Sequence, residues 1–191
     1  VATVRKVKDA GLWGVKFYTS MNPAWIAPGA AEAHKLGLHV HGHVPATMKP
    51  SEAVAAGYDE LTHLNFVVME SMPRDVIDKA NTRARMEGPA RYFKDVDLDA
   101  PLMKGFIADL ATKRTVIDPT IVIFEGMLTQ DGGKPQPAYA PYMGIISPVI
   151  ERSVFTSGGY PVVEGLTRDD YRKSYAKMVE LVGKLHKAGV P

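Results

Sequence analysis

Short strand-like runs alternate with helix-like segments along this chain, and the alternation is the feature that most constrains its fold. The runs are rich in aromatic and β-branched residues and cover 13–19, 38–44, 58–66 and 115–124. Helix-like segments separate them, over 22–36, 50–57, 71–95 and 99–110. Strands that alternate with helices pair in parallel through right-handed crossovers. The sequence therefore predicts an α/β fold with a parallel sheet.

Turn and capping residues mark where the helical segments begin and end. Asn22-Pro23 opens the first internal helix, which has room for a break at Pro28-Gly29 and stops at Gly37. Gly57 stands where a left-handed helix cap is common. Asp99 is expected to cap the helix that follows it. The apolar face of that helix comprises Leu102, Met103, Phe106, Ile107 and Leu110.

The second half of the chain departs from the regular alternation. Residues 71–95 look helical but charged, so we expect a mostly solvated surface there. Pro119 predicts that regular pairing of the fourth strand ends at that position. Residues 125–165 form a long excursion with one helical piece around 142–153. A final helix starts with a capping-box-like segment at 167–170 and carries a core stripe of Tyr171, Tyr175, Met178, Leu181, Val182 and Leu185.

The spacing of the strands indicates part of a barrel. Gly189 ends the last helix, and Val190-Pro191 looks like the first step of a fifth strand. Early strand starts lie about 25 residues apart, close to the ~31 of a (β/α)8 barrel. We expect residues 1–191 to form a single domain, a partial (β/α)8 TIM barrel of roughly strands four to seven with their helices, truncated at both ends. A small doubly wound sheet is the alternative.

Composition limits the classes of partner. The 23 Lys and Arg residues nearly balance 21 Asp and Glu residues, without a block of like charge, so neither nucleic acid nor a membrane surface is an expected partner. No cysteine is present, which excludes a disulfide framework and a thiolate metal site. No apolar run reaches the ~18 residues of a transmembrane helix. The compartment stays open because the natural N-terminus is expected to lie upstream of this sequence.

Three side chains suited to metal chemistry stand at the ends of successive strand-like runs. His43 and His63 follow the second and third runs, and Lys16 lies late in the first. Chemistry in parallel α/β folds collects at the carboxyl ends of strands, and neighbouring strands lie ~4.8 Å apart, so side chains from adjacent strands can share one ion. Neutral imidazole suits a divalent metal, and a catalytic site keeps a position for water. Tyr18 is a candidate substrate contact, although a packing role is favoured for it.

Structural roles are expected for the remaining conspicuous residues. His39 and His41 alternate with His43 and would face the same way; they could extend the site, but inward-facing packing is preferred. His34 and His186 are expected at the surface. The methionines are expected in the core, and Trp13 and Trp25 are interpreted as packing anchors. For Lys16, an unmodified and salt-bridged lysine is the alternative to a metal ligand.

The three strand motifs also carry a family resemblance. Gly14-Val15-Lys16-Phe17-Tyr18, Gly42-His43-Val44-Pro45 and Leu61-Thr62-His63-Leu64 resemble consecutive strand motifs of the amidohydrolase superfamily, most closely the branch of imidazolonepropionases and Xaa-Pro dipeptidase-like enzymes. The resemblance implies that Lys16 matches a lysine carboxylated by CO₂ that bridges two metals. It implies that His43 and His63 match metal ligands of the fifth and sixth strands. Val116-Ile117-Asp118-Pro119-Thr120 is similar to the seventh-strand segment.

The chain also departs from that family pattern. The first-strand His-x-His pair would lie upstream of Val1, and the eighth-strand aspartate, the general base, would follow Pro191. His41 and Thr62 stand where the branch usually has a small residue and a glutamate. Loss of a general base slows hydrolysis by about 10²–10⁴-fold. We therefore expect little or no hydrolysis by this chain alone.

The sequence thus predicts a fragment of a metal-dependent hydrolase that cleaves C–N bonds with a metal-activated water. The expected cofactor is a divalent metal, preferably Zn²⁺, with one or two ions in the intact enzyme and none required in the fragment. The expected substrate is an amide, a cyclic amide or a dipeptide. Two alternatives stay open: an aldolase-type barrel in which Lys16 forms a Schiff base, and a non-catalytic half-barrel that self-associates to cover its open edges.

Overall fold

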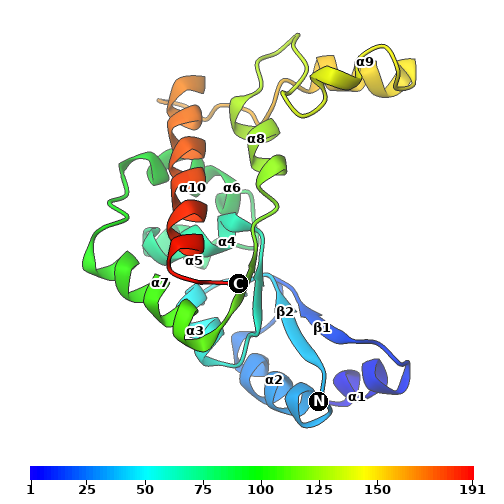
Figure 1. The fold of residues 1–191 in the computed structure, drawn as a ribbon, viewed down its shortest axis with the longest axis vertical. Helices are drawn as coiled ribbons and strands as arrows, with labels where there is room; N and C mark the ends of the chain where they lie inside the picture. The colour runs from blue at the N-terminus through cyan, green and yellow to red at the C-terminus, as the bar shows by residue number, and fades with distance from the viewer.

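The chain forms one parallel sheet of four short strands with helices after each strand (Figure 1). This computed structural model describes the backbone of residues 1–191 and every side chain except that of Ser157. The strands are β1 (Gly14–Phe17), β2 (His39–Gly42), β3 (Glu60–Thr62) and β4 (Val116–Asp118), and they lie side by side in chain order. The register places Lys16 beside His41, His41 beside Glu60, and Thr62 beside Asp118. The predicted parallel α/β sheet is confirmed.

The helices follow the strands along the chain in the alternating order that the sequence predicts. The α-helices are α1 (Ala2–Asp9), α2 (Ile26–Lys35), α3 (Pro50–Ala55), α4 (Leu64–Val68), α5 (Arg74–Asp78), α6 (Ala84–Tyr92), α7 (Pro101–Lys113), α8 (Ile121–Thr129), α9 (Pro148–Ser157) and α10 (Arg168–Lys187). Short 3₁₀ turns are η1 (Pro23–Trp25), η2 (Met69–Ser71), η3 (Phe93–Asp95) and η4 (Ala140–Tyr142). No helix in the described part of the chain is long and apolar enough to cross a bilayer.

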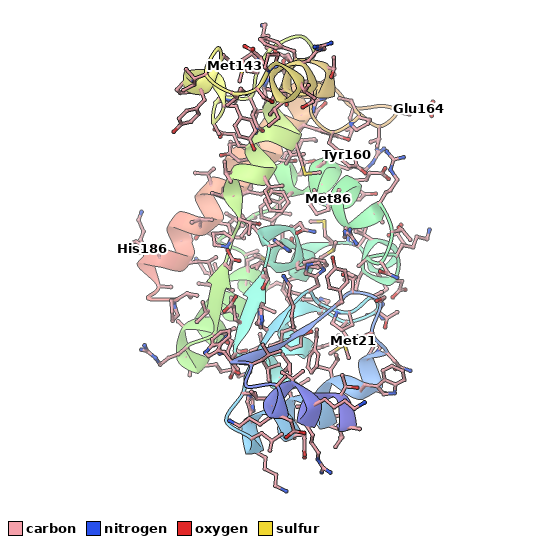
Figure 2. The ribbon with its side chains drawn as sticks, turned by 90° about the vertical axis from the view of Figure 1, so that its right-hand side faces the viewer. Met21, Met86, Met143, Tyr160, Glu164 and His186 are labelled. Atoms are coloured by element: carbon pink, nitrogen blue, oxygen red, sulfur yellow. The ribbon has the colours of Figure 1, made fainter. Side chains whose placement is uncertain are left out.

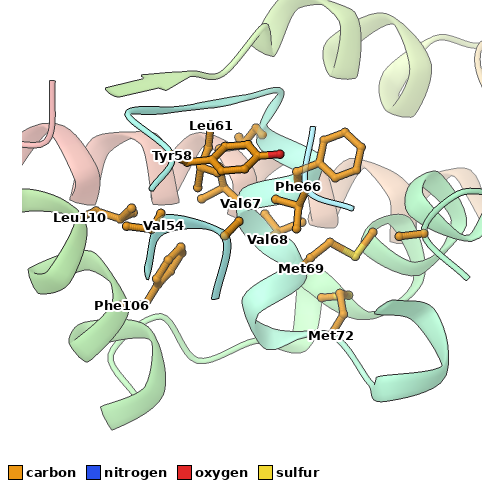
Figure 3. Close-up of a cluster of buried hydrophobic side chains, with 14 of the residues drawn as sticks. Val54, Tyr58, Leu61, Phe66, Val67, Val68, Met69, Met72, Phe106 and Leu110 are labelled. Carbon is orange, nitrogen blue, oxygen red and sulfur yellow. The ribbon is translucent and has the colours of Figure 1, made fainter. Parts of the chain in front are cut away.

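The two faces of the sheet differ in polarity because side chains alternate along each strand. Val15, Phe17, Val40 and Leu61 point to the helix-covered face and are buried. Figure 3 shows this core, where Leu61 and Tyr58 lie near α4 and the α7 side chains of Phe106 and Leu110. The other face carries the polar set of Lys16, His39, His41, Glu60, Thr62 and Asp118. The sheet thus presents a polar face beside its apolar core.

All four strands end earlier than predicted, and β3 and β4 are followed by a helix where the strand was expected to continue. β3 stops at Thr62 instead of residue 66, and β4 stops at Asp118 instead of residue 124. The turns are made by His63, with φ of 71°, and by Thr120, with φ of 44°. Pro119 ends the pairing of β4 as expected, because it lacks a donor. A short apolar run looks the same in a strand and in a buried helix. The prediction that residues 64–66 and 121–124 continue the strands is therefore wrong, because these residues lie in α4 and α8.

Other expectations are corrected in the same way. Asp99 does not cap α7, whose N-cap is Ala100; its carboxylate instead binds Lys184 on α10. Leu102 is exposed, so the buried face of α7 is narrower than predicted. No break occurs at Pro28-Gly29, since α2 runs through both residues. The 71–95 segment is not mainly solvated, because α5, α6 and η3 bury Val76, Ile77, Ala90 and Phe93.

The two tryptophans are not packing anchors. Trp13 is 66% exposed and Trp25 is 62% exposed. The ring of Trp13 stacks on His39 at a centroid distance of 4.3 Å and lies 5.8 Å from the ring of His41. By contrast, the core stripe of α10 is confirmed, with Tyr171, Met178, Leu181 and Leu185 buried.

The long excursion forms an arm at one end of the molecule. Figure 1 shows α9 extending away from the sheet beyond α8, and Figure 2 places Met143 and Glu164 at the end opposite Met21. The helical piece is confirmed in part, as η4 and α9. The chain returns through α10, which follows its predicted Thr167–Asp170 capping box. The Ile117 N–H then donates to the carbonyl oxygen of Pro191 at 3.0 Å, so the end of the chain lies beside β4.

Candidate metal centre

The His43 ring is placed by a glycine that no other residue can replace. Gly42 ends β2 with φ of 131°, and a Cβ there would lie 2.2 Å from the Phe17 carbonyl oxygen. This close approach lets the His43 N–H donate to the same Phe17 oxygen at 3.0 Å. The side chain of His43 is only 5% exposed, although it lies at a strand end. Backbone geometry that only glycine tolerates therefore delivers His43 to the carboxyl edge of the sheet.

Three neighbours fix the buried imidazole of His43. Its Nδ1 lies 3.2 Å from the hydroxyl oxygen of Thr19, which follows β1 and is itself buried. The ring of Phe66 stacks on it with centroids 4.7 Å apart, and the ring of Tyr18 lies at 4.1 Å. Tyr18 is 51% exposed, so it lies at the open side of this cluster and not in the core. Its ring packs on His43 while half of its surface stays exposed, and a substrate contact for Tyr18 stays a prediction.

His63 occupies a strained turn between β3 and α4. Its backbone has φ of 71° and ψ of 123°, outside the regions that L-residues commonly adopt. Its N–H donates to the Asp118 carbonyl oxygen at 2.8 Å, which ties it to β4. Its Nδ1 lies 2.9 Å from the hydroxyl oxygen of Thr120. Thr120 has φ of 44°, which is uncommon for a β-branched residue.

The two predicted histidines are brought together. The rings of His43 and His63 lie edge to face with centroids 4.8 Å apart. Burial lowers the pKa of His43 to about 4, and the charges of His63, Lys16 and Arg85 act in the same direction. Burial also lowers the pKa of His63, helped by Lys16 and Arg85 and opposed by Asp118. Both rings are therefore neutral near pH 7 and carry a lone pair suited to a metal.

The second nitrogen of each ring has no protein partner among the described residues and is not fully buried. Neither Nε2 has a hydrogen-bond partner among the described side chains and backbone. Every buried side-chain nitrogen or oxygen in the described part of the chain does have a partner. The Nε2 atoms are consequently not buried, although His43 is buried as a residue. This arrangement presents two imidazole nitrogens to a ligand while Nδ1 of each ring is held by a threonine.

Two cations lie near this pair without an ion-pair partner. Lys16 is exposed at the end of β1, and no ion pair is formed by its ammonium group among the described residues. The salt-bridged alternative for Lys16 is therefore not what the structure contains. Arg85, half-buried in the first turn of α6, was not identified from the sequence. Its carbonyl oxygen accepts from Asn65, two residues after His63, which anchors α6 beside the site. A charged helical segment is normally solvated, so the sequence held no signal for Arg85.

Thr19 and Thr120 were also missed by sequence reasoning. Each lies two residues beyond the end of an outer strand and contacts a histidine that follows an inner strand. Pro119-Thr120 belongs to the segment that resembles the seventh strand of the family. Its position at a strand end, next to a proline that stops pairing, is the one signal that pointed to Thr120.

His39 and His41 do not extend the candidate centre. Their nearest carboxylate is Glu60, with His39 Nε2 at 3.1 Å and His41 Nδ1 at 3.9 Å from its oxygens. The ring of Trp13 covers His39 on this polar face. Among the described residues, neither ring contacts His43 or His63, and their expected common direction with His43 stays a prediction. His34 and His186 are exposed, as predicted.

The donor set fits part of a metal centre. Among the described residues, no three His, Asp or Glu side chains are grouped so that they could hold an ion. The site therefore offers the His43 and His63 imidazoles, with Lys16 on the neighbouring strand. Structural zinc sites use four protein ligands and catalytic ones use three with water, so this pair supplies two of them.

Comparisons of the chain with protein-family models, with curated proteins and with solved structures find no match. Functional inference for this chain therefore starts from the geometry of its own residues.

Proposed function

We propose that the chain carries part of the metal centre of an amidohydrolase-type hydrolase, an enzyme that cleaves C–N bonds in amides, cyclic amides or dipeptides. The observation that carries the proposal is the His43–His63 pair. Two neutral imidazoles follow adjacent parallel strands, each held at Nδ1 by a threonine and open at Nε2. Metal-binding histidines typically have their other nitrogen fixed in this way.

Sequential strand order supports the partial-barrel interpretation. A doubly wound sheet reverses its strand order at a switch point, whereas β1 to β4 follow chain order. The hydrogen bond from Ile117 to Pro191 brings the end of the chain beside β4, which is compatible with this interpretation. We therefore propose that the sheet is a segment of a (β/α)8 barrel, in which the carboxyl ends of the strands form the active site.

Backbone strain also supports a functional site. His63 and Thr120 are two of four non-glycine residues with positive φ in the described chain, and they contact each other. Residues in sparsely populated regions cost of order 1–3 kcal/mol each and cluster at active sites. Because these two strained residues are joined by a side-chain hydrogen bond, we infer that their backbone geometry serves function and not stability alone.

The chemistry divides between the ion and the protein. A bound divalent metal such as Zn²⁺ would lower the pKa of water towards ~7 and polarise the scissile carbonyl. His43 and His63 would hold it, and carboxylated Lys16 would add oxygen ligands from the neighbouring strand. Tyr18, at the open side of His43, would contact the substrate. The catalytic residue is unassigned, and slow or absent hydrolysis is predicted for this chain.

Elemental analysis tests the proposal. The chain is exposed to Zn²⁺ and bicarbonate, freed of excess ion and compared with His43→Ala/His63→Ala. A matched control, His34→Ala/His186→Ala, removes two exposed histidines. About one metal per chain, lost only in the first double variant, is the expected result. Equal metal in all three proteins, or none in any of them, would refute the site. Ready turnover of a dipeptide by the chain would contradict the prediction of weak hydrolysis.

A further inference from the structure

Exposed apolar side chains gather at the two ends of this molecule. One set belongs to the arm, residues 125–165, where Ile145 is 78% exposed and Val149 is 73% exposed. No described residue of α9 is buried, so the body of the molecule does not cover the apolar side of this helix. The other set surrounds β1 and includes Leu12, which is 57% exposed, and Trp25, which is 62% exposed. Large exposed apolar patches mark interaction sites or association hazards.

The two ends have complementary shapes. A cavity of ≈ 490 Å³ opens beside β1, the edge strand of the sheet, and is lined by residues of α1, β1, η1 and α2. The apolar part of its wall comprises Val4, Val7, Leu12, Val15, Phe17 and Trp25. The arm, by contrast, projects from the molecule, with α9 extending away beyond α8 (Figure 1). One end is therefore hollowed, and the other end presents aliphatic side chains on a projection.

The two ends also carry opposite net charge. Residues 1–37, which form the β1 end, contain five Lys and Arg residues against two Asp and Glu residues. Lys6 and Lys8, in the last turn of α1, form no ion pair among the described residues. The arm contains four Asp and Glu residues against two Lys and Arg residues, and within the described chain Glu151 and Glu164 are not ion-paired. Such charge complementarity steers two surfaces together and fixes their register.

The placement of the two ends indicates how two copies can pair. In Figure 1, α9 lies at the top and β1 with α1 at the bottom, and both project to the same side, away from α7 and α10. The arm therefore lies far from its own β1 end. A two-fold axis on that side brings each arm to the β1 end of the other copy. Such a pair makes the same contact twice and closes on itself, as the common two-fold dimers do.

We propose that the chain forms a two-fold dimer in which the arm of each copy seats its apolar side chains in the β1 cavity of the other copy. Ile145 and Val149 enter the cavity, and the acidic residues of the arm face the lysines of α1. The dimer also covers the open edge of β1, which would otherwise remain available for association. This interface is independent of the proposed metal centre, because His43 and His63 belong to neither surface.

A charge exchange between two variants tests the pairing of unlike ends. Lys6→Glu/Lys8→Glu reverses the charge of α1, and Glu151→Lys/Glu164→Lys reverses that of the arm. Sedimentation equilibrium at low salt should show a wild-type dimer and, for each variant alone, a dissociation constant at least about tenfold higher. An equimolar mixture of the two variants should regain the wild-type constant to within a few-fold, because each arm then meets an oppositely charged β1 end.

The matched control is Lys173→Glu/Lys187→Glu, which makes the same change of charge on α10, away from both surfaces. It should keep the wild-type dissociation constant, and thermal unfolding shows that all variants are folded. A wild type that is monomeric at every concentration would overturn the proposal. A mixture that associates no better than its two components would overturn it as well.

Cross-linking locates the contact, because the chain has no cysteine of its own. Thr3→Cys places a thiol in the wall of the cavity, and Ser153→Cys places one on the exposed surface of α9. A short bismaleimide should link an equimolar mixture of these variants into dimers, with peptides that join residues 3 and 153. Each variant alone should stay unlinked, since like positions lie at opposite ends of the dimer. Equally efficient linking of Ser153→Cys to itself would show arm-to-arm pairing and overturn the proposal.

Discussion

The hydroxyl of Tyr58 donates a hydrogen bond of 2.8 Å to the carbonyl oxygen of His43. Tyr58 is buried at the end of the loop before β3, and its ring meets Phe17 edge to face at 5.8 Å. Burial raises the pKa of Tyr58 well above its usual value, so the phenol remains a donor at every physiological pH. The candidate metal centre is thus tied through its backbone to the hydrophobic core.

Tyr58→Phe should destabilise the chain by about 1–3 kcal/mol, because the buried His43 carbonyl oxygen would lose its donor. Chemical denaturation at pH 7.5 measures the free energy of unfolding. Tyr92→Phe is the control, since Tyr92 is exposed and its hydroxyl has no partner among the described residues. A Tyr58→Phe value within 0.5 kcal/mol of the control, a margin typical of surface substitutions, would show that the hydrogen bond contributes nothing.

Gly42→Ala should be among the most damaging single substitutions in the chain. The added Cβ would lie 2.2 Å from the Phe17 carbonyl oxygen, at a φ of 131° that L-residues rarely adopt. We expect a loss of about 3 kcal/mol or more, or no folded protein. Gly183→Ala on α10 is the matched control: no atom lies within 4 Å of its Cβ, and alanine favours a helix by about 1 kcal/mol. Equal melting temperatures for the two variants would contradict this account of β2.

Arg85→Gln should raise the pKa of both His43 and His63 towards the ordinary histidine value, because the charge of Arg85 lowers both. The pKa values are measured by NMR titration of the ring protons. Arg83→Gln is the control, since Arg83 pairs with Glu87 and does not act on either ring. Unchanged pKa values in Arg85→Gln would place the guanidinium away from the site.

The parallel sheet could be predicted from the sequence, whereas the residues that surround and hold the two histidines could not. The hydrophobic periodicity and the capping residues located the four strands and α10. The alternation of strand and helix then left few possible topologies for the sheet. The positions of His43 and His63 at the ends of predicted strands were sufficient to identify them as candidate site residues. Thr19, Thr120 and Arg85 could not be identified in this way, since their roles depend on which strands are neighbours and on where a charged turn folds back. The strand ends at Thr62 and Asp118 were missed because the left-handed turns at His63 and Thr120 are made by residues that do not favour them.

Self-association is expected from two exposed apolar regions. The arm exposes Ile145 at 78% and Val149 at 73%, and a cavity of ≈ 490 Å³ with Val15, Phe17 and Trp25 in its wall lies beside β1. Exposed apolar patches and unpaired strand edges favour association. Light scattering should give a mass above 20.8 kDa that rises with concentration. Ile145→Ser/Val149→Ser should lower it, whereas Val179→Ser on α10 should not. A monomer at every concentration would refute the expectation.

Acidification should destabilise the chain through His43. Unfolding restores the histidine pKa from about 4 to 6.5, so between these values the unfolded chain binds more protons than the folded chain. Stability is therefore complete above pH 6.5 and falls as the pH drops towards 4. Between pH 7.5 and 5, His43 should account for up to about 2 kcal/mol, allowing for solvent screening.

Urea unfolding across that range measures the slope, in an interval where most carboxylates stay ionised. His43→Gln should flatten the dependence, leaving the smaller contributions of His63 and His41, whose pKa values burial also lowers. The control His186→Ala removes an exposed histidine that has no ion pair or hydrogen bond from its ring among the described residues, and it should keep the full slope. The same slope in His43→Gln and wild type would show that the His43 ring is not the buried, neutral group on which the proposed centre depends.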